Sequence, residues 1–328
     1  MENGKLYVDS LLVSVAAVAG VLIFAGHGLA DSGQEQPQQT SAGSPVIFDG
    51  RLGLGYLTGE SQEYVFDPAS GRKVSELTWE LTDIYMLNGG ISIRPLSWVR
   101  INMDLWLKLT DGNGDMDDYD WFVEGLDWTH WSHTDDLELT TGFMLDMNVE
   151  FPFYSTGETS FSGFVGYKYD TWEWEAKGGN YIYSVYSFRD TAGSFPPGES
   201  GITYEQWFHV PYVGIGFNSR LTNVSFHGRL IASPFVQAGD EDHHHMRNLL
   251  FEEDFDNGSM VALDIGGGYH FTEHLALLLS YHYQKYNEMK GDMTITDQVT
   301  GQKIHIGGDV AGVEHNSSLF SLTLSYTF

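Results

Sequence analysis

The chain has 328 residues, of which 16 are Lys or Arg and 45 are Asp or Glu, so its formal net charge is −29. So acidic a chain repels the phosphate backbone of nucleic acids and favours cationic partners. It contains no cysteine, which excludes disulfides and Cys-based zinc sites. Its 38 glycines and 14% aromatic residues are typical of β structure with aromatic girdles.

The first 30 residues are expected to be a secretory signal peptide. Lys5 precedes an apolar run from Leu11 to Ala25, which is shorter than the ~20 residues that a membrane-spanning helix needs. Small residues at Gly28 and Ala30 follow, as a signal peptidase requires. Residues 31–44 lack large apolar residues and are predicted to be a flexible leader, which leaves 45–328 for the folded domain.

From Val46 onward, apolar and polar residues alternate with a period of two in several stretches. Such alternation gives an extended strand one apolar face and one polar face. The clearest stretches are 99–109, 143–151, 261–271 and the C-terminal residues 320–328. A soluble β-sandwich alternates in the same way, so this pattern alone does not distinguish a sandwich from a membrane barrel.

The export signal, the last strand and the order of the connections favour a barrel in the outer membrane. The alternation that ends at Phe328 resembles the closing strand of bacterial outer-membrane proteins. Short connections near 95–96, 155–158, 219–223 and 272–273 alternate with long polar ones at about 60–73, 110–136, 177–205, 239–258 and 287–315. This order predicts an all-β fold, a ten-stranded antiparallel transmembrane β-barrel with five long extracellular loops, short periplasmic turns and both termini in the periplasm.

A barrel of this size has a lumen that its own side chains largely fill. The polar faces of the predicted strands carry charged or aromatic groups, among them Arg100, Asp104, Trp106, Lys108 and Asp146. A general porin is therefore disfavoured, and the function is expected at the outer mouth.

Two short acidic stretches could carry chemistry there. Asp118 and Asp120 are two residues apart, and so are Asp242 and His244, so each pair would share one face of an extended strand. Two close carboxylates can share a proton and polarise a water molecule. A histidine that a carboxylate orients can take a proton from that water near neutral pH. The two pairs together would activate water without a metal ion or a covalent nucleophile.

Other interpretations of the same stretches stay open. Residues 111–118 alternate oxygen donors with glycine, as calcium-binding loops do. The run from Asp240 to His245 could be a solvated acidic loop. It could also ligate zinc, although adjacent histidines point to opposite sides of a strand and the sequence has no HExxH motif. The sequence has no GxSxG motif for a serine nucleophile either.

Five segments of the chain are distinctive and occur in this order: GRKVSELTW (71–79), DYDWF (118–122), GGNYIYS (178–184), FRDTAGSFPPGE (188–199) and DEDHH (240–244). Together they resemble the omptins, outer-membrane proteases built on a ten-stranded barrel. The resemblance covers most of residues 50–328. It implies that Asp118 and Asp120 are the catalytic aspartate couple and that Asp242 and His244 are the Asp-His dyad.

The resemblance also implies a pocket for a basic side chain. Glu63 and Asp240 match the acidic residues that receive the substrate residue on the amino side of the cleaved bond, called P1. Carboxylates in such a pocket select Arg or Lys through charge-assisted hydrogen bonds, in agreement with the acidic composition. Glu241, His243 and His245 would lie on the opposite face of the strand, away from the reaction.

Two regions depart from the family pattern. His130 stands where the family often has an acid that favours a basic residue at P1′, on the leaving side. On the outer wall, Tyr167 matches the family's lipopolysaccharide site, but Tyr169, Thr171 and Trp207 replace a Glu and two Arg. Basic groups for lipid phosphates are therefore missing. We expect no cofactor, and a lipopolysaccharide requirement that is weakened or differently built.

The sequence thus predicts a monomeric endopeptidase of the bacterial outer membrane, with an aspartyl-type site that faces the exterior. Its partners would be cationic peptides or proteins, cleaved after Arg or Lys, and the lipid of the outer membrane. The alternative is a non-enzymatic barrel whose acidic loops bind cationic partners or act as an adhesin.

Overall fold

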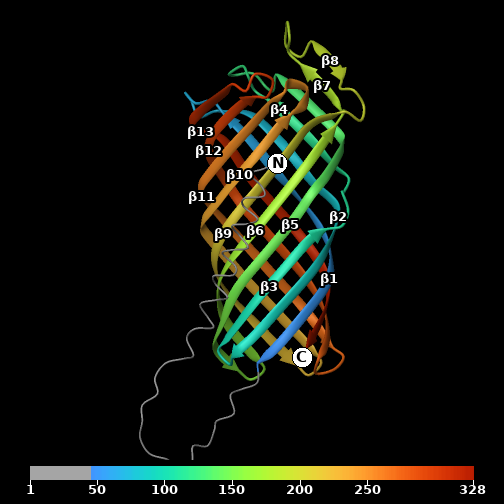
Figure 1. Ribbon diagram of the computed structural model, residues 1–328, viewed down its shortest axis with the longest axis vertical. Helices are drawn as coiled ribbons and strands as arrows, with labels where there is room; N and C mark the ends of the chain where they lie inside the picture. Colours follow the sequence, from blue (N-terminus) through green and yellow to red (C-terminus); the bar gives the residue numbers. More distant parts are fainter. Residues whose placement is uncertain (1–45) are drawn as a thin grey trace, which may run out of the picture. The chain divides into compact units, whose positions relative to one another are not determined.

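The computed structural model describes residues 46–328, which form a barrel (Figure 1). The predicted signal peptide, 1–30, and leader, 31–44, lie outside the described residues. In the described part of the chain, no helix is long and apolar enough to cross a membrane.

Ten long strands form the wall of the barrel. They are β1 (Ile47–Phe66), β2 (Lys73–Leu96), β3 (Val99–Lys108), β5 (His130–Thr156), β6 (Thr159–Lys177), β9 (Ser200–Leu221), β10 (Val224–His244), β11 (Leu249–His270), β12 (Leu275–Asp297) and β13 (Lys303–Thr327). Neighbours in this order pair antiparallel, and β1 pairs with β13, which closes the ring. Closure leaves no strand edge unpaired, as lipid requires. The predicted ten-stranded antiparallel barrel is confirmed.

Short elements extend the wall at the upper rim in Figure 1. Strand β4 (Gly114–Asp120) continues the line of β3 and pairs with both β2 and β5. Strands β7 (Asn180–Tyr183) and β8 (Thr191–Ser194) form a hairpin that pairs with the first residues of β5. One 3₁₀ turn, η2 (His245–Arg247), joins β10 to β11. The upper rim is therefore built mostly of paired strands.

The upper connections are shorter than predicted. The expected loop 239–258 consists of β10 and β11 with the turn at 245–248 between them, and the expected loop 287–315 shrinks to 298–302. Apolar alternation fades in these segments because their outward side chains, such as the exposed Asp254, face water rather than lipid. Strand pairing nevertheless continues, which the apolar pattern alone could not indicate.

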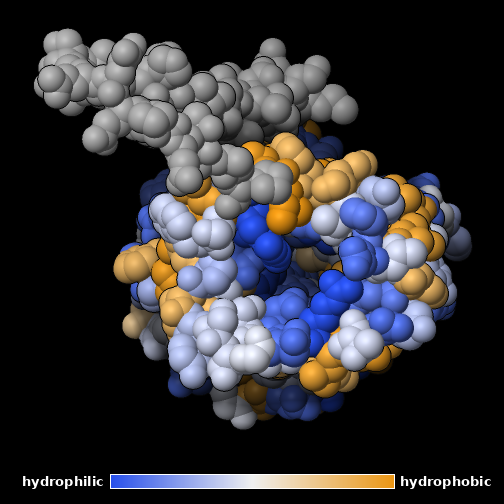
Figure 2. Space-filling model, turned by 90° about the horizontal axis from the view of Figure 1, so that it is seen from below, coloured by the Kyte–Doolittle hydropathy of each residue, from blue (hydrophilic) through white to orange (hydrophobic). Residues whose placement is uncertain are grey.

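Lipid-facing and lumen-facing residues separate in the lower half of the barrel. Exposed apolar residues form an outer belt that includes Leu54, Leu263 and Leu322. From below, hydrophobic residues lie around the rim and hydrophilic residues line the hollow interior (Figure 2). A cavity of about 330 Å³ there contains Arg229, which forms ion pairs with Asp146 and Asp264. Ion pairs thus occupy the lower lumen.

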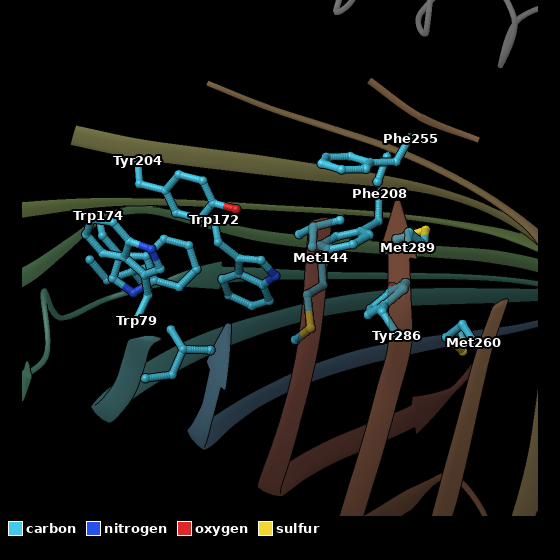
Figure 3. Packing of buried hydrophobic residues seen from close by; sticks show 14 of the residues in the cluster. Trp79, Met144, Trp172, Trp174, Tyr204, Phe208, Phe255, Met260, Tyr286 and Met289 are labelled. Carbon is cyan, nitrogen blue, oxygen red and sulfur yellow. The ribbon is translucent and has the colours of Figure 1, made fainter. Parts of the chain in front are cut away.

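An apolar and aromatic layer separates this lumen from the upper mouth. Trp79 stacks on Tyr204 at 5.0 Å between ring centroids, and Tyr204 stacks on Trp174 at 5.9 Å. Phe208 stacks on Tyr286 at 4.2 Å. These groups project from several strands toward one another (Figure 3). Close packing of large buried rings gives the mouth a rigid floor.

Three adjacent strands change the facing of their side chains within one irregular zone. In β10 the inward side chains have odd numbers up to Ser233 and even numbers from Val236, and the pairing register shifts between these two residues. Interruptions of pairing lie beside it, at 256–259 in β11 and after Tyr286 in β12. Such bulges insert one residue into the alternation. The bulge at 234–235 turns the even-numbered residues of upper β10 toward the interior.

Candidate active site

One cavity at the upper mouth brings together residues that are far apart in the sequence. It has a volume of about 370 Å³, and its lining includes Asp118 and Asp120 from β4 and His244 from the end of β10. Asp118 and Asp120 share a face of β4 because they are two residues apart. The sequence spacing therefore placed each pair on one face, and barrel closure brings the two faces together across the cavity.

The dyad is formed within β10. His244 Nε2 lies 2.6 Å from Asp242 Oδ2, and the two side chains are 18% and 3% exposed. The ring of Phe251, from β11, packs edge-on against the imidazole with centroids 5.2 Å apart. A buried carboxylate at this distance orients the ring and stabilises its protonated form. The arrangement can serve as a general base.

Both members of the aspartate couple have raised pKa values. Ser132, directly opposite on β5, donates a hydrogen bond of 3.4 Å to Asp118 Oδ2. Burial, then the charges of Asp120 and Asp242, raise the pKa of Asp118 well above its usual value, although Arg247 acts in the opposite direction. Burial also raises the pKa of Asp120. A carboxyl group with a raised pKa keeps its proton to a higher pH, and in that form it can donate a hydrogen bond as well as accept one.

Glu63 and Asp240 lie deeper in the barrel and do not line this cavity. Their side chains are 3% and 1% exposed, and the Tyr204 hydroxyl donates a 2.9 Å hydrogen bond to Asp240 Oδ2. Burial, then the charges of Asp242, Asp240 and Asp118, raises the pKa of Glu63 well above its usual value. Two buried carboxylates whose charges act on each other would be stabilised by a cation between them.

The sequence analysis missed four residues of this region: Ser132, Tyr204, Arg247 and Glu253. Ser132 and Glu253 each occupy the position directly opposite a predicted site residue, Asp118 and Asp240 respectively. Knowledge of the strand register would have revealed Ser132 and Glu253, but the sequence contains no signal that fixes the register between these strands.

The outward face of upper β10 has no part in the cavity. The rings of His243 and His245 contact each other with centroids 4.0 Å apart, and His245 Nε2 lies 2.7 Å from Thr203 Oγ1. Within residues 46–328, no group of three or more His, Asp or Glu side chains is arranged to hold a metal ion.

The two regions that depart from the family pattern have distinct surroundings. His130 lines the cavity and lies between two aromatic rings, Phe122 at 5.0 Å and Tyr183 at 4.9 Å between centroids. On the outer wall, four glutamates stand directly opposite one another across four strands: Glu173, Glu205, Glu241 and Glu252. We call them the glutamate row.

Comparison with known proteins gives a consistent result. A sequence profile of the Omptin family matches residues 45–328. The chain is 32% identical over 319 residues to the Plasminogen activator of Yersinia pestis. The aligned region covers 94% of this chain and 97% of that protein. It is 29% identical to Outer membrane protease OmpP of Escherichia coli, over 87% of this chain and 91% of that protein. The crystal structure of outer membrane protease OmpT from Escherichia coli matches with a TM-score of 0.83 and 26% identity, over 88% and 99% of the two chains.

Proposed function

The chain belongs to the omptin family of bacterial outer-membrane proteases, and from this premise we propose that it cleaves peptides after Arg or Lys. The reaction would use water activated between the Asp118–Asp120 couple and the Asp242–His244 dyad. The observation that carries the proposal is the single cavity lined by the couple and by His244.

The proposed mechanism begins with a water molecule between the couple and His244. His244 takes a proton from the water as the oxygen attacks the scissile carbonyl, and Asp242 stabilises the imidazolium that forms. Burial raises the pKa of Asp118 well above its usual value, so in the proposed mechanism Asp118 carries the proton of the couple and donates a hydrogen bond to the negative charge that develops on the carbonyl oxygen. The imidazolium then returns the proton to the leaving amine. No covalent intermediate is needed.

Substrate selection would reside in Glu63 and Asp240. Both carboxylates are buried and do not line the catalytic cavity, so the proposed P1 side chain must be long enough to extend past that cavity. Ionised carboxylates there form charge-assisted hydrogen bonds with the cationic end of that side chain. Cationic peptides outside the cell are thus the proposed substrates, and the acidic chain attracts them to the mouth.

The test uses refolded protein and a fluorogenic peptide with one Arg. Asp242→Asn and His244→Ala are each expected to lower kcat by about 10²- to 10⁴-fold, because each removes the oriented general base. His243→Ala is the matched control, since His243 lies on the outward face and should leave the rate unchanged. Full activity in either dyad variant would refute the mechanism.

The same assay separates this function from its alternatives. EDTA should leave the rate intact because every proposed step uses side chains and water, and loss of activity with EDTA would point to a metal enzyme instead. A folded protein that binds the cationic peptide without cleaving it would be the adhesin-like barrel.

A further inference from the structure

Glu253 is a buried acid that the proposed mechanism does not use. It lies on β11 directly opposite Asp240 on β10, so the two side chains share the inward face of the hairpin. Its side chain is 2% exposed, and neither Oε1 nor Oε2 has a hydrogen-bond partner within residues 46–328. A buried polar group without a partner is costly, and native structures rarely keep one without a reason.

Glu253 belongs to a group of three carboxylates. Glu63 Oε2 and Asp240 Oδ1 also lack partners in the described part of the chain, which makes four such oxygen atoms with the two of Glu253. The ion pairs of residues 46–328 include none of these three acids. We call Glu63, Asp240 and Glu253 the acidic trio. Its four open acceptors are suited to a ligand that is cationic and rich in N–H donors.

Acids of the trio shift one another's pKa values. Burial first, then the charges of Asp240 and Glu63, raise the pKa of Glu253 well above its usual value. When Glu253 carries a proton it can donate that proton to Asp240, and this hydrogen bond, absent from the ionised pair, raises its pKa further. Burial likewise raises the pKa of Asp240. Three buried carboxyl groups whose charges act on one another cannot all ionise at little cost, so the trio favours the retention of a proton. A cation that enters can replace that proton.

We propose that Glu253 is the third acid of the P1 pocket and that it makes the pocket prefer Arg to Lys. The inference rests on the function proposed above and adds a specificity-determining residue to it. A guanidinium offers five N–H donors in a planar fork, whereas an ammonium offers three. Only the guanidinium has enough donors for all four open oxygens of the trio.

Arginine entry must also displace the side chains that close the pocket. The trio is buried in this structure and does not line the catalytic cavity. Only a long side chain with several donors can reach the carboxylates and compensate for that displacement. A short or neutral P1 residue leaves the trio protonated and gains nothing from it.

The experiment compares three peptides that differ only at P1: Arg, Lys and the neutral isostere citrulline. For the wild type, kcat/KM is expected to be about tenfold higher for Arg than for Lys, and citrulline should be far poorer. Glu253→Gln removes the charge and the shared proton, so the Arg-to-Lys ratio should fall at least about fivefold. Glu252→Gln is the matched control. It makes the same chemical change one residue earlier, where the side chain faces outward, and it should keep the wild-type ratio.

The outcomes separate the two proposals. If the wild type cleaves none of the peptides, the proposed function fails. If it cleaves Arg and Lys peptides equally well, or if Glu253→Gln lowers both in proportion, the role of Glu253 is overturned while the protease assignment stands.

A second measurement covers the case in which Glu253→Gln does not fold. Propylguanidine and butylamine are tested as competitive inhibitors of the wild type with the Arg peptide. The guanidine is expected to inhibit about tenfold more tightly and to release more protons on binding, as followed by calorimetry in buffers of different ionisation enthalpy. Equal inhibition, or binding without proton release, would overturn the inference.

Discussion

Burial determines the pKa values of individual carboxylates in the upper part of this barrel. The pKa values of Glu63 and Asp240 are raised well above their usual values, chiefly by desolvation. An acid with a raised pKa loses its charge at a higher pH than a solvated carboxylate does as the pH falls. The proposed pocket for a basic side chain should therefore lose its affinity while most surface acids are still ionised.

The upward direction of these two pKa shifts predicts how substrate selection depends on pH. The ratio of kcat/KM for an Arg peptide to that for its citrulline analogue should fall as the pH is lowered from about 8 to about 5, because protonation removes the pocket charge that only Arg uses. The ratio cancels the titration of the catalytic residues, which affects both peptides. A ratio that stays flat over this range would show that the pocket acids are not those that bind the substrate.

The geometry of the candidate site was predictable from the residues alone only where local spacing decides which side chains share a face. The i, i+2 spacings of Asp118 with Asp120 and of Asp242 with His244 are sufficient to place each pair on one face. The positions of Ser132 and Glu253 depend on which residue of a neighbouring strand stands opposite. Pairing register is a property of two strands, so neither partner was visible in the chain alone.

At the scale of strands, the glutamate row is an unfavourable element of the outer wall. Like charges directly opposite one another destabilise a sheet. Glu205, in the middle of the row, pairs with Glu173 on one side and Glu241 on the other. Burial, then the charges of Glu173 and Glu241, raises its pKa to about 7. The cost of the row therefore depends on pH.

Glu205→Gln should stabilise the barrel at high pH only. Below the ordinary pKa of Glu, about 4.3, Glu205 is protonated in both folded and unfolded chains and costs nothing. The penalty grows as the pH rises toward 7 and is complete above it. Allowing for solvent screening, we expect the substitution to raise the free energy of unfolding by about 1–2 kcal/mol at pH 8 and by about zero at pH 4.

Urea unfolding in detergent micelles, followed by tryptophan fluorescence, measures this effect. Glu158→Gln, in the exposed turn between β5 and β6, is the control that should change nothing at either pH. A stabilisation that is the same at both pH values would mean that ionisation of Glu205 is not its cause.

At the scale of the whole molecule, the barrel divides into a lipid-facing belt and a water-facing upper part. Leu322 pairs with Leu54 on one side and Leu279 on the other, and all three are exposed. Ile304, higher on the same strand, is 53% exposed, similar to the 51% of Leu322. Exposure alone therefore does not distinguish the two positions, but their surroundings in a membrane do.

Leu322→Arg should impair folding into lipid vesicles far more than Ile304→Arg. A charge on the lipid face near the bilayer centre costs about 2–4 kcal/mol, whereas the same charge in water costs little. The measurement is the fraction of protein that reaches the folded, heat-modifiable form on a gel. Equal losses for both variants would place the apolar belt elsewhere on the barrel.

The belt is also the part of the fold that the sequence predicts best. Lipid on one side and a polar lumen on the other force strict alternation, which stretches such as 261–271 display. Above the belt both faces of the wall are polar or mixed, so the alternation weakens although the strands continue. The ring of ten strands was predictable for this reason, and the height of its wall was not.

The bulge at 234–235 has a consequence for how such a protein can change. It decides whether the even-numbered or the odd-numbered side chains face the interior in the nine positions from Val236 to His244. An insertion or deletion of one residue in that stretch would turn Asp240, Asp242 or His244 outward, whereas a change of two would only shift their height. Substitutions can therefore accumulate in the belt without disturbing the chemistry, but the stretch from Val236 to His244 can change in length only by an even number of residues.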